Sequence, residues 1–182
     1  EIERILSQLS HYLCQKTVEF SETKEVLLEC DILFSQAQLA HHLEAHPPEF
    51  DPNQIELLGL RHPLLIYNQH NPLEKKQTVI RNDVKMDDQN RILLLSGPNA
   101  GGKTVLLKSI GLAAHMARCG LLICADEGSK IPFFAEIHVA VGDSQNIDAQ
   151  LSTFAAHLKI LNGASYVHGN HHLLLIDEIC GS

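Results

Sequence analysis

The sequence lacks several features that would assign it to whole classes of protein. None of its apolar runs approaches the roughly 20 residues that a membrane-spanning helix needs. Its first ten residues, EIERILSQLS, do not have the basic-then-apolar pattern of a secretion signal. Its five cysteines form no CxxC pair, which favours reduced thiols over a disulfide framework. We therefore expect a cytoplasmic protein that does not interact with a membrane.

An excess of basic residues is also lacking. The chain has 14 Lys and Arg against 22 Asp and Glu, for a net charge of −8. A basic footprint for nucleic acid over the whole chain is therefore absent, and DNA binding would need a local patch or parts of a longer protein. At 182 residues with 45% hydrophobic content, the chain can form one α/β domain with a small attachment, or two small domains.

Residues 1–46 contain neither glycine nor proline. Apolar residues recur there at steps of three and four, which predicts one long helix or two helices with a break near Phe20-Ser21. We expect this helical domain to serve as a dimer or core helix rather than to carry chemistry. The breaker-rich HPPEFDPNQ of residues 46–54 predicts a linker, and residues 47–182 are expected to form a second domain. The bursts IELLGL, LLIY and TVI that follow predict strands with an irregular connection.

Residues 97–104, GPNAGGKT, match the phosphate-binding motif GxxxxGK[ST]. Glycines 101 and 102 let backbone N–H groups converge on phosphate oxygens, Lys103 brings a positive charge, and the Thr104 hydroxyl is suited to Mg²⁺. The flanks predict a strand at Ile92–Leu95 and a helix at Val105–Met116, whose dipole would favour the same anion. A chance glycine-rich turn is the alternative, and both flanks argue against it. The sequence thus predicts a site for a nucleoside triphosphate.

Two adjacent acids, Asp177 and Glu178, follow the apolar run Leu173–Ile176, which predicts a strand inside a parallel sheet. In phosphate-loop proteins an aspartate at such a strand end holds Mg²⁺, and an acid directly after it can activate the attacking water. The alternative is that both acids simply close a strand. Together with the phosphate loop upstream, the pair indicates an ATPase rather than a passive nucleotide binder.

The motifs together resemble the ATPase domain of the MutS family. The resemblance covers essentially the whole chain, and it implies an α/β fold of the phosphate-loop, ABC-ATPase-like kind: a sheet flanked by helices. Residues 1–46 would be a stub of the long-helix core or lever domain, and residues 47–182 an ATPase domain truncated after the Walker B strand. The similar segments are LLECDILFSQAQLA (27–40), RHPLL (61–65), VIRNDVKM (79–86), GPNAGGKT (97–104), GLLICADEGSKIPFFAEI (120–137), VGDSQNIDAQLSTFAAHL (141–158) and LLLIDEICGS (173–182).

Details favour the second bacterial branch of that family. His157 stands where mismatch-repair members generally carry glutamate, and GDSQNI (142–147) and ADEGSKIP (125–132) are similar to the second branch. That branch lacks the mismatch-reading domain and is associated with branched DNA, recombination control and stalled ribosomes. Mismatch-repair MutS proper remains an alternative. A phosphate-loop ATPase of the ABC or chromosome-maintenance class is another, although LSTF (151–154) differs from the LSGG-like signature of that class.

The resemblance also implies a role for each matching position. Ser152 and Thr153 would face the γ-phosphate of ATP bound to a partner subunit, although either residue is also an ordinary helix N-cap. Val79 and Ile80 would line the adenine pocket, and the first of these departs from the aromatic residue that many members have there. Lys103 and Glu178 would be catalytic, and Thr104 and Asp177 would hold Mg²⁺. The phosphates of ATP would be held by Gly97, Pro98, Asn99, Ala100, Gly101, Gly102, Lys103 and Thr104.

The family acts as a dimer that couples ATP to closure of a clamp around DNA, so a homodimer and DNA are the implied partners, with ribosomes possible in this branch. In the family the chain continues beyond the two acids. We therefore expect this chain to be complete at the phosphates but impaired in hydrolysis and dimer closure, without a nuclease domain. A fragment that only binds nucleotide or only dimerises is the non-enzymatic alternative.

His168, His171 and His172 have a spacing similar to that of metal ligands. No cysteine or acid near them in the sequence completes a set of ligands, so we expect a solvated loop rather than a metal site.

Overall fold

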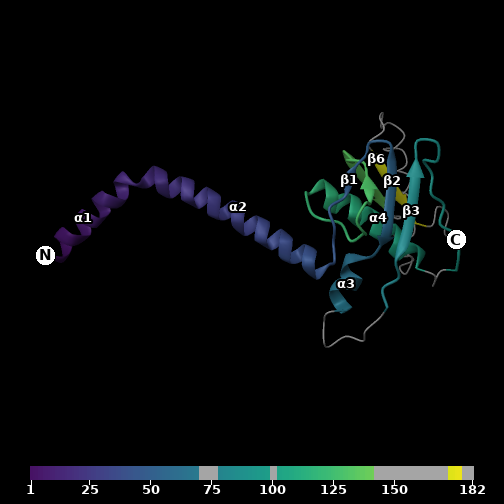
Figure 1. The fold of residues 1–182 in the computed structure, drawn as a ribbon, viewed down its shortest axis with the longest axis horizontal. Coiled ribbons are helices and arrows are strands. Elements are labelled where there is room, and N and C mark those ends of the chain that lie inside the picture. The colour runs from purple at the N-terminus through teal and green to yellow at the C-terminus, as the bar shows by residue number, and fades with distance from the viewer. Residues whose placement is uncertain (70–77, 99–101, 142–171, 178–182) are drawn as a thin grey trace, which may run out of the picture. The chain divides into compact units, whose positions relative to one another are not determined.

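The computed structural model describes residues 1–69, 78–98, 102–141 and 172–177 (Figure 1). The chain divides into two compact units, Glu1–Leu39 and Ala40–Ser182. The division into domains at residues 46 and 47 stays a prediction. No helix in the described ranges is both long and apolar enough to cross a membrane.

The first unit consists of helix α1 (Ile2–Gln15) and most of helix α2 (Thr17–His42). The sequence predicted one helix or two with a break near Phe20-Ser21. The structure has two helices, and the break lies at Lys16, four residues before the predicted position. The backbone N–H of Lys16 donates to the carbonyl of Leu13 at 3.0 Å, and the Thr17 hydroxyl donates to the Cys14 carbonyl at 2.7 Å. These tighter bonds replace the regular helical ladder for one turn and separate the two helices.

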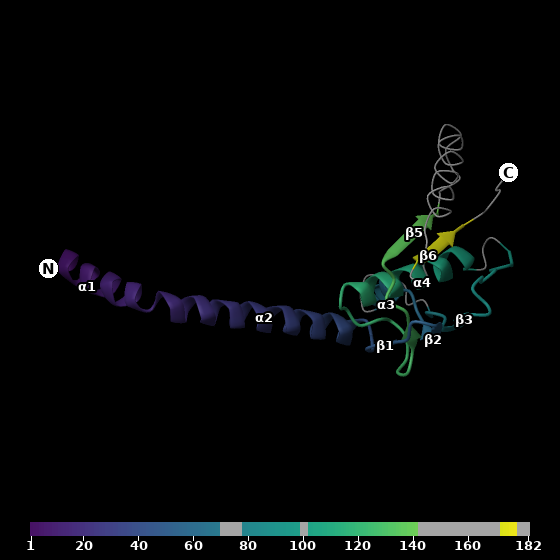
Figure 2. The same ribbon diagram turned by 90° about the horizontal axis from the view of Figure 1, so that it is seen from above.

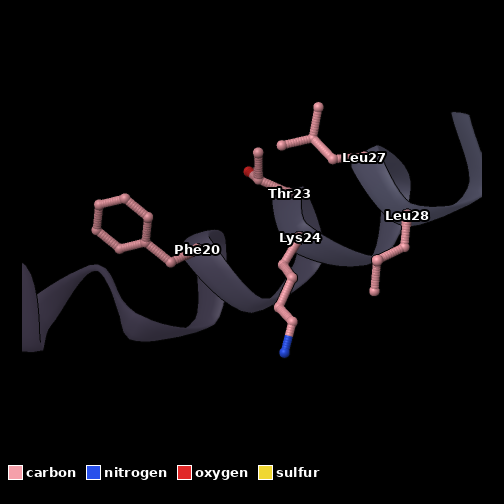
Figure 3. A pocket seen from close by; sticks show the side chains of 5 residues that line it. All are labelled: Phe20, Thr23, Lys24, Leu27 and Leu28. Atoms are coloured by element: carbon pink, nitrogen blue, oxygen red, sulfur yellow. The ribbon is translucent and has the colours of Figure 1, made fainter. Parts of the chain in front are cut away.

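No residue of helix α1 or helix α2 is buried. Figure 3 shows five side chains of α2 that line a pocket on this helix: Phe20, Thr23, Lys24, Leu27 and Leu28. Phe20 and Leu27 are 56% and 63% exposed, and they repeat at the spacing of one helix face. The apolar periodicity therefore predicted the helices correctly, but within this unit that face lies open to solvent.

The second unit contains a four-stranded sheet in the order β1-β4-β2-β3. Its long antiparallel pair, β2 and β3, aligns Ile55 with Met86 and Leu57 with Val84. Ile55, Leu57 and Val84 are buried, as expected for strands with one face on a core. The register shifts between Leu57 and Leu60, around Gly59. The strand bounds are β1 (Glu49–Phe50), β2 (Gln54–Leu60), β3 (Asn82–Asp87) and β4 (Lys130–Ile131).

The LLIY burst, which the sequence predicts as a strand, belongs instead to helix α3 (Pro63–Gln69). Proline at the first helical position has its φ already set for a helix and loses no helical hydrogen bond. The N–H groups of Leu65 and Ile66 both donate to the His62 carbonyl, at 3.0 and 3.2 Å, and close the first turn. The TVI burst has no regular structure at residues 78–80. A run of four apolar residues has no periodicity that would distinguish a helix from a strand.

The second sheet is a parallel pair, β5 (Glu136–Ala140) and β6 (His172–Ile176), beside helix α4 (Lys103–Arg118), as Figure 2 shows. The predicted helix and the predicted apolar strand in a parallel sheet are both confirmed. Gly111 of α4 comes so close to β6 that a Cβ there would be 2.5 Å from Leu175 Cδ1. Leu173, Leu175 and the inner face of α4 belong to one buried core; that face is Ile110, Ala113, Ala114 and Ala117.

The predicted strand Ile92–Leu95 is not a strand in the structure. Ile92 and Leu94 are 89% and 80% exposed. No described strand pairs with this segment, and an extended segment without a ladder partner leaves its backbone groups to solvent. The described residues are thus a mixed α/β unit with two small sheets, and one continuous sheet flanked by helices stays a prediction.

Gly59→Ala should destabilise the second unit strongly. Gly59 has φ +54°, and a Cβ there would be 2.3 Å from Asp126 Oδ2 and 3.1 Å from Arg81 Nε. The left-handed backbone alone costs alanine about 1–2 kcal/mol, and displacement of Asp126 adds to this. Gly128→Ala is the matched control, because Gly128 has φ +81° with nothing within 4 Å of the added carbon. Urea unfolding should show a clearly larger loss for Gly59→Ala, and equal losses would contradict the proposed clash.

Candidate nucleotide-phosphate site

Glycine backbone conformations form the junction between the loop and helix α4. Gly102 is the N-cap of α4, with φ +79° and ψ +10°, and its carbonyl accepts a hydrogen bond from the Leu106 N–H at 2.9 Å. Gly97 has φ +149°. Residues with a side chain rarely adopt either conformation, which explains why the motif needs glycine at both positions. The N–H groups of a first helical turn point out of the helix end, which favours an anion beside the loop.

Lys103, the first residue of α4, turns its side chain back over this loop. Its Nζ donates a hydrogen bond to the carbonyl oxygen of Gly97. The ammonium group therefore lies over the start of the motif, where the sequence predicts phosphate. Because Lys carries its charge on a flexible stem, it can exchange this carbonyl for a phosphate oxygen.

Thr104 and Asp177, which are far apart in the sequence, meet at the end of β6. The Thr104 hydroxyl donates a hydrogen bond to Asp177 Oδ2 at 2.6 Å. Asp177 is held by its own backbone, because its N–H donates to the Ala140 carbonyl at 2.9 Å and continues the parallel ladder one residue beyond β6. Adjacent ligands of an octahedral Mg²⁺ ion lie about 2.9 Å apart, so this pair of hard oxygen donors fits that ion with little movement.

A cavity of about 750 Å³ lies beside these groups. Both Lys103 and Asp177 line it, together with the irregular segment 91–95 and strand β6. Lys103 and Asp177 thus border a space whose other walls combine leucines and isoleucines with polar residues, among them Asp87, Asp88 and Arg91.

The structure separates the two residues predicted for the adenine pocket. Val79 packs on a small buried cluster that includes Ile66 and Cys124, whereas Ile80 is 74% exposed. Their contact with adenine stays a prediction. Asn99, Ala100, Gly101, Ser152, Thr153 and Glu178 lie outside the described residues.

An ion-pair network that sequence reasoning missed connects the segments around the four-stranded sheet. Asp126 pairs with Arg81 at the start of β3, and its Oδ1 lies 3.9 Å from the Arg61 guanidinium. Arg61 is only 5% exposed, and it also pairs with Glu44 and donates to the Glu44 carbonyl at 2.9 Å. The sequence assigns Asp126 no partner, because both arginines lie at least 45 residues away along the chain.

The described residues thus form an α/β unit in which Lys103 lies over Gly97 and a threonine–aspartate pair meets at the end of β6. Residues 93–181 match a protein family described as MutS domain V. Along 98% of its length the chain is 39% identical to an "Endonuclease MutS2" of Streptococcus thermophilus and 40% identical to one of an Anaeromyxobacter species. These matches support a MutS-family protein similar to the MutS2 endonucleases. The chain spans about 22% of the length of the first of these relatives and 23% of the second.

Cys124, which is buried, should resist alkylation. Burial raises the pKa of its thiol to about 11, against an opposing effect of the Arg61 charge. At pH 8 a thiol with that pKa is about 0.1% thiolate, the reactive form. Cys14, Cys30 and Cys119 are exposed.

Iodoacetamide at pH 8, followed by peptide mass spectrometry, should label these three cysteines quickly and Cys124 at least about 100-fold more slowly. Labelling in urea is the control, where Cys124 should react like the others. Rapid labelling of Cys124 in the folded chain would show that the cluster around it is not closed.

Proposed function

We propose that this chain is the ATP-binding and ATP-hydrolysing module of a MutS-like protein that acts on DNA in repair or recombination control. The observation that carries the proposal is the hydrogen bond between Thr104 and Asp177, residues 73 positions apart. The sequence predicts these two as the Mg²⁺ ligands, and the fold brings them together beside Lys103. The match to MutS domain V over residues 93–181 supports the same conclusion independently.

Each described group has a physical role in binding the triphosphate. The glycines at 97 and 102 permit the backbone to approach phosphate closely, and the N-terminus of α4 favours its negative charge. Lys103 would exchange the Gly97 carbonyl for the β- and γ-phosphate oxygens, while Thr104 and Asp177 would hold Mg²⁺. The ion, when bound, neutralises charge on the phosphates and orients them.

Hydrolysis needs groups beyond the described residues. Glu178, directly after Asp177, is the proposed general base for the attacking water. Ser152 and Thr153 are proposed to contact ATP bound to a second subunit, which makes the working unit a homodimer. DNA, branched or mismatched, and ribosomes are proposed as partners of the whole protein. The similarity to proteins named "Endonuclease MutS2" favours the second bacterial branch over mismatch-repair MutS proper.

Lys103→Ala should weaken binding of a fluorescent ATP analogue at least about 10-fold in the presence of Mg²⁺, because the variant loses the phosphate-facing charge. Lys108→Ala is the matched control, since it removes an exposed lysine from the same helix and should bind normally. Phosphate release from ATP, measured in the same samples, tests the hydrolytic part. Equal binding by Lys103→Ala and the unaltered chain would refute the phosphate site.

Thr104→Val should weaken the dependence of ATP affinity on Mg²⁺. The substitution keeps the shape of the side chain but removes the hydroxyl that meets Asp177. Loss of a residue that supports a metal ligand typically weakens metal affinity 10–100-fold, so Mg²⁺ should bind at least about 10-fold more weakly here. Thr104→Ser, which keeps the hydroxyl, is the control and should restore the dependence. If Thr104→Val binds Mg²⁺ and ATP like the unaltered chain, the proposed metal role of Thr104 is wrong.

A further inference from the structure

Strands β5 and β6 have a second face, opposite the face that packs under α4. Their parallel register places Glu136 directly beside His172, and Ile137 beside Leu173. Side chains alternate between the faces of a strand, so His138 lies on the same face as Glu136. Leu173 belongs to the core and Ile137 packs against it, which assigns the other face to Glu136, His138 and His172.

The donor atoms of these three side chains converge. His138 Nε2 lies 2.9 Å from Glu136 Oε2, and His172 Nδ1 lies 3.8 Å from the same oxygen. One donor atom from each residue lies within 4.8 Å of the other two. The two imidazole rings stack, with centroids 6.4 Å apart and an interplanar angle of 27°.

Both converging ring nitrogens are buried and lack a hydrogen bond. His138 Nε2 and His172 Nδ1 have no partner with hydrogen-bond geometry among the described residues. The short contact from His138 to Glu136 is therefore close but poorly directed. A buried polar atom without a partner costs free energy, about 1–3 kcal/mol for each. An ion between the three residues would satisfy both nitrogens and the carboxylate together.

The chemistry of the donors selects the ion. Two imidazole nitrogens and one carboxylate oxygen are ligands that Zn²⁺ accepts, whereas Mg²⁺ and Ca²⁺ prefer oxygen alone. A tetrahedral zinc site separates its nitrogen and oxygen donors by about 3.4 Å. The two distances to Glu136 Oε2, 2.9 and 3.8 Å, lie on either side of that value. Three protein ligands leave a fourth position for water.

We propose that Glu136, His138 and His172 bind one Zn²⁺ ion that ties the first residues of β5 and β6 together. The expectation of a solvated loop was wrong for His172, which begins strand β6 and lies beside Glu136, an acid distant in the sequence. His168 and His171 lie outside the described residues. His172 also lines the cavity beside Lys103 and Asp177, but it lies at the other end of β6 from Asp177. His172 begins β6 and Asp177 follows it, about 16 Å apart along an extended strand.

Zinc binding by the 182-residue chain tests the proposal directly. After treatment with a chelator and its removal, the chain is titrated with ZnCl₂ against a chromophoric competitor. One tight site is expected, and the double variant H138A/H172A should bind zinc at least about 100-fold more weakly, since even supporting residues around metal ligands contribute 10–100-fold. The matched control is H11A/H41A, which removes two exposed histidines and should bind like the unaltered chain. Circular dichroism checks that each variant is folded.

A second measurement separates this site from the exposed cysteines. Co²⁺ in place of Zn²⁺ should give a visible spectrum without the thiolate charge-transfer band that cysteine ligands produce. Zinc binding should also survive Lys103→Ala, so failure of the phosphate site leaves this result unaffected. The proposal is overturned if the unaltered chain binds no zinc, if H138A/H172A binds it as tightly, or if the cobalt spectrum shows thiolate ligands.

Discussion

The close packing of helix α4 on strand β6 is the constraint on which the rest of the described α/β unit depends. Gly111 makes this close packing possible, because a side chain at that position would overlap Leu175. With the helix this close, Thr104 near its start reaches Asp177 at the end of the strand. The geometry of the candidate site is therefore a consequence of how the helix and strand share their core, rather than of the loop alone.

A second constraint acts on the four-stranded sheet. The charged side chain of Arg61 is buried. A buried charge is stable only where groups of opposite charge pair with it. Asp126 and Glu44 provide those charges, and Asp126 also reaches Arg81 at the start of β3. One acid thus connects the segments after β2, before β3 and before β4. Gly59 leaves the space that this acid occupies.

Strand β6 carries different chemistry at its two ends. At its start, the His172 ring lies near His138 and Glu136. Directly after its end, Asp177 accepts a hydrogen bond from the Thr104 hydroxyl. Nitrogen donors suit zinc and hard oxygen donors suit magnesium, so the two proposed ion sites would lie at opposite ends of one short strand. The buried leucines between them, Leu173 and Leu175, hold the strand in place for both.

The sequence by itself determined what depends on neighbours along the chain. The period of apolar residues defined α4 and the first helices, the apolar run defined β6, and the glycines of GPNAGGKT marked the turn into α4. Only the tertiary structure decided what depends on a distant partner. Ile92–Leu95 has the composition of a strand but no ladder partner among the described residues. The run LLIY lies in helix α3, which begins at Pro63. Asp126 meets Arg61 and Arg81 where segments that are distant in the sequence come together. His172 meets Glu136 across a sheet, where the register of the two strands sets which side chains lie side by side.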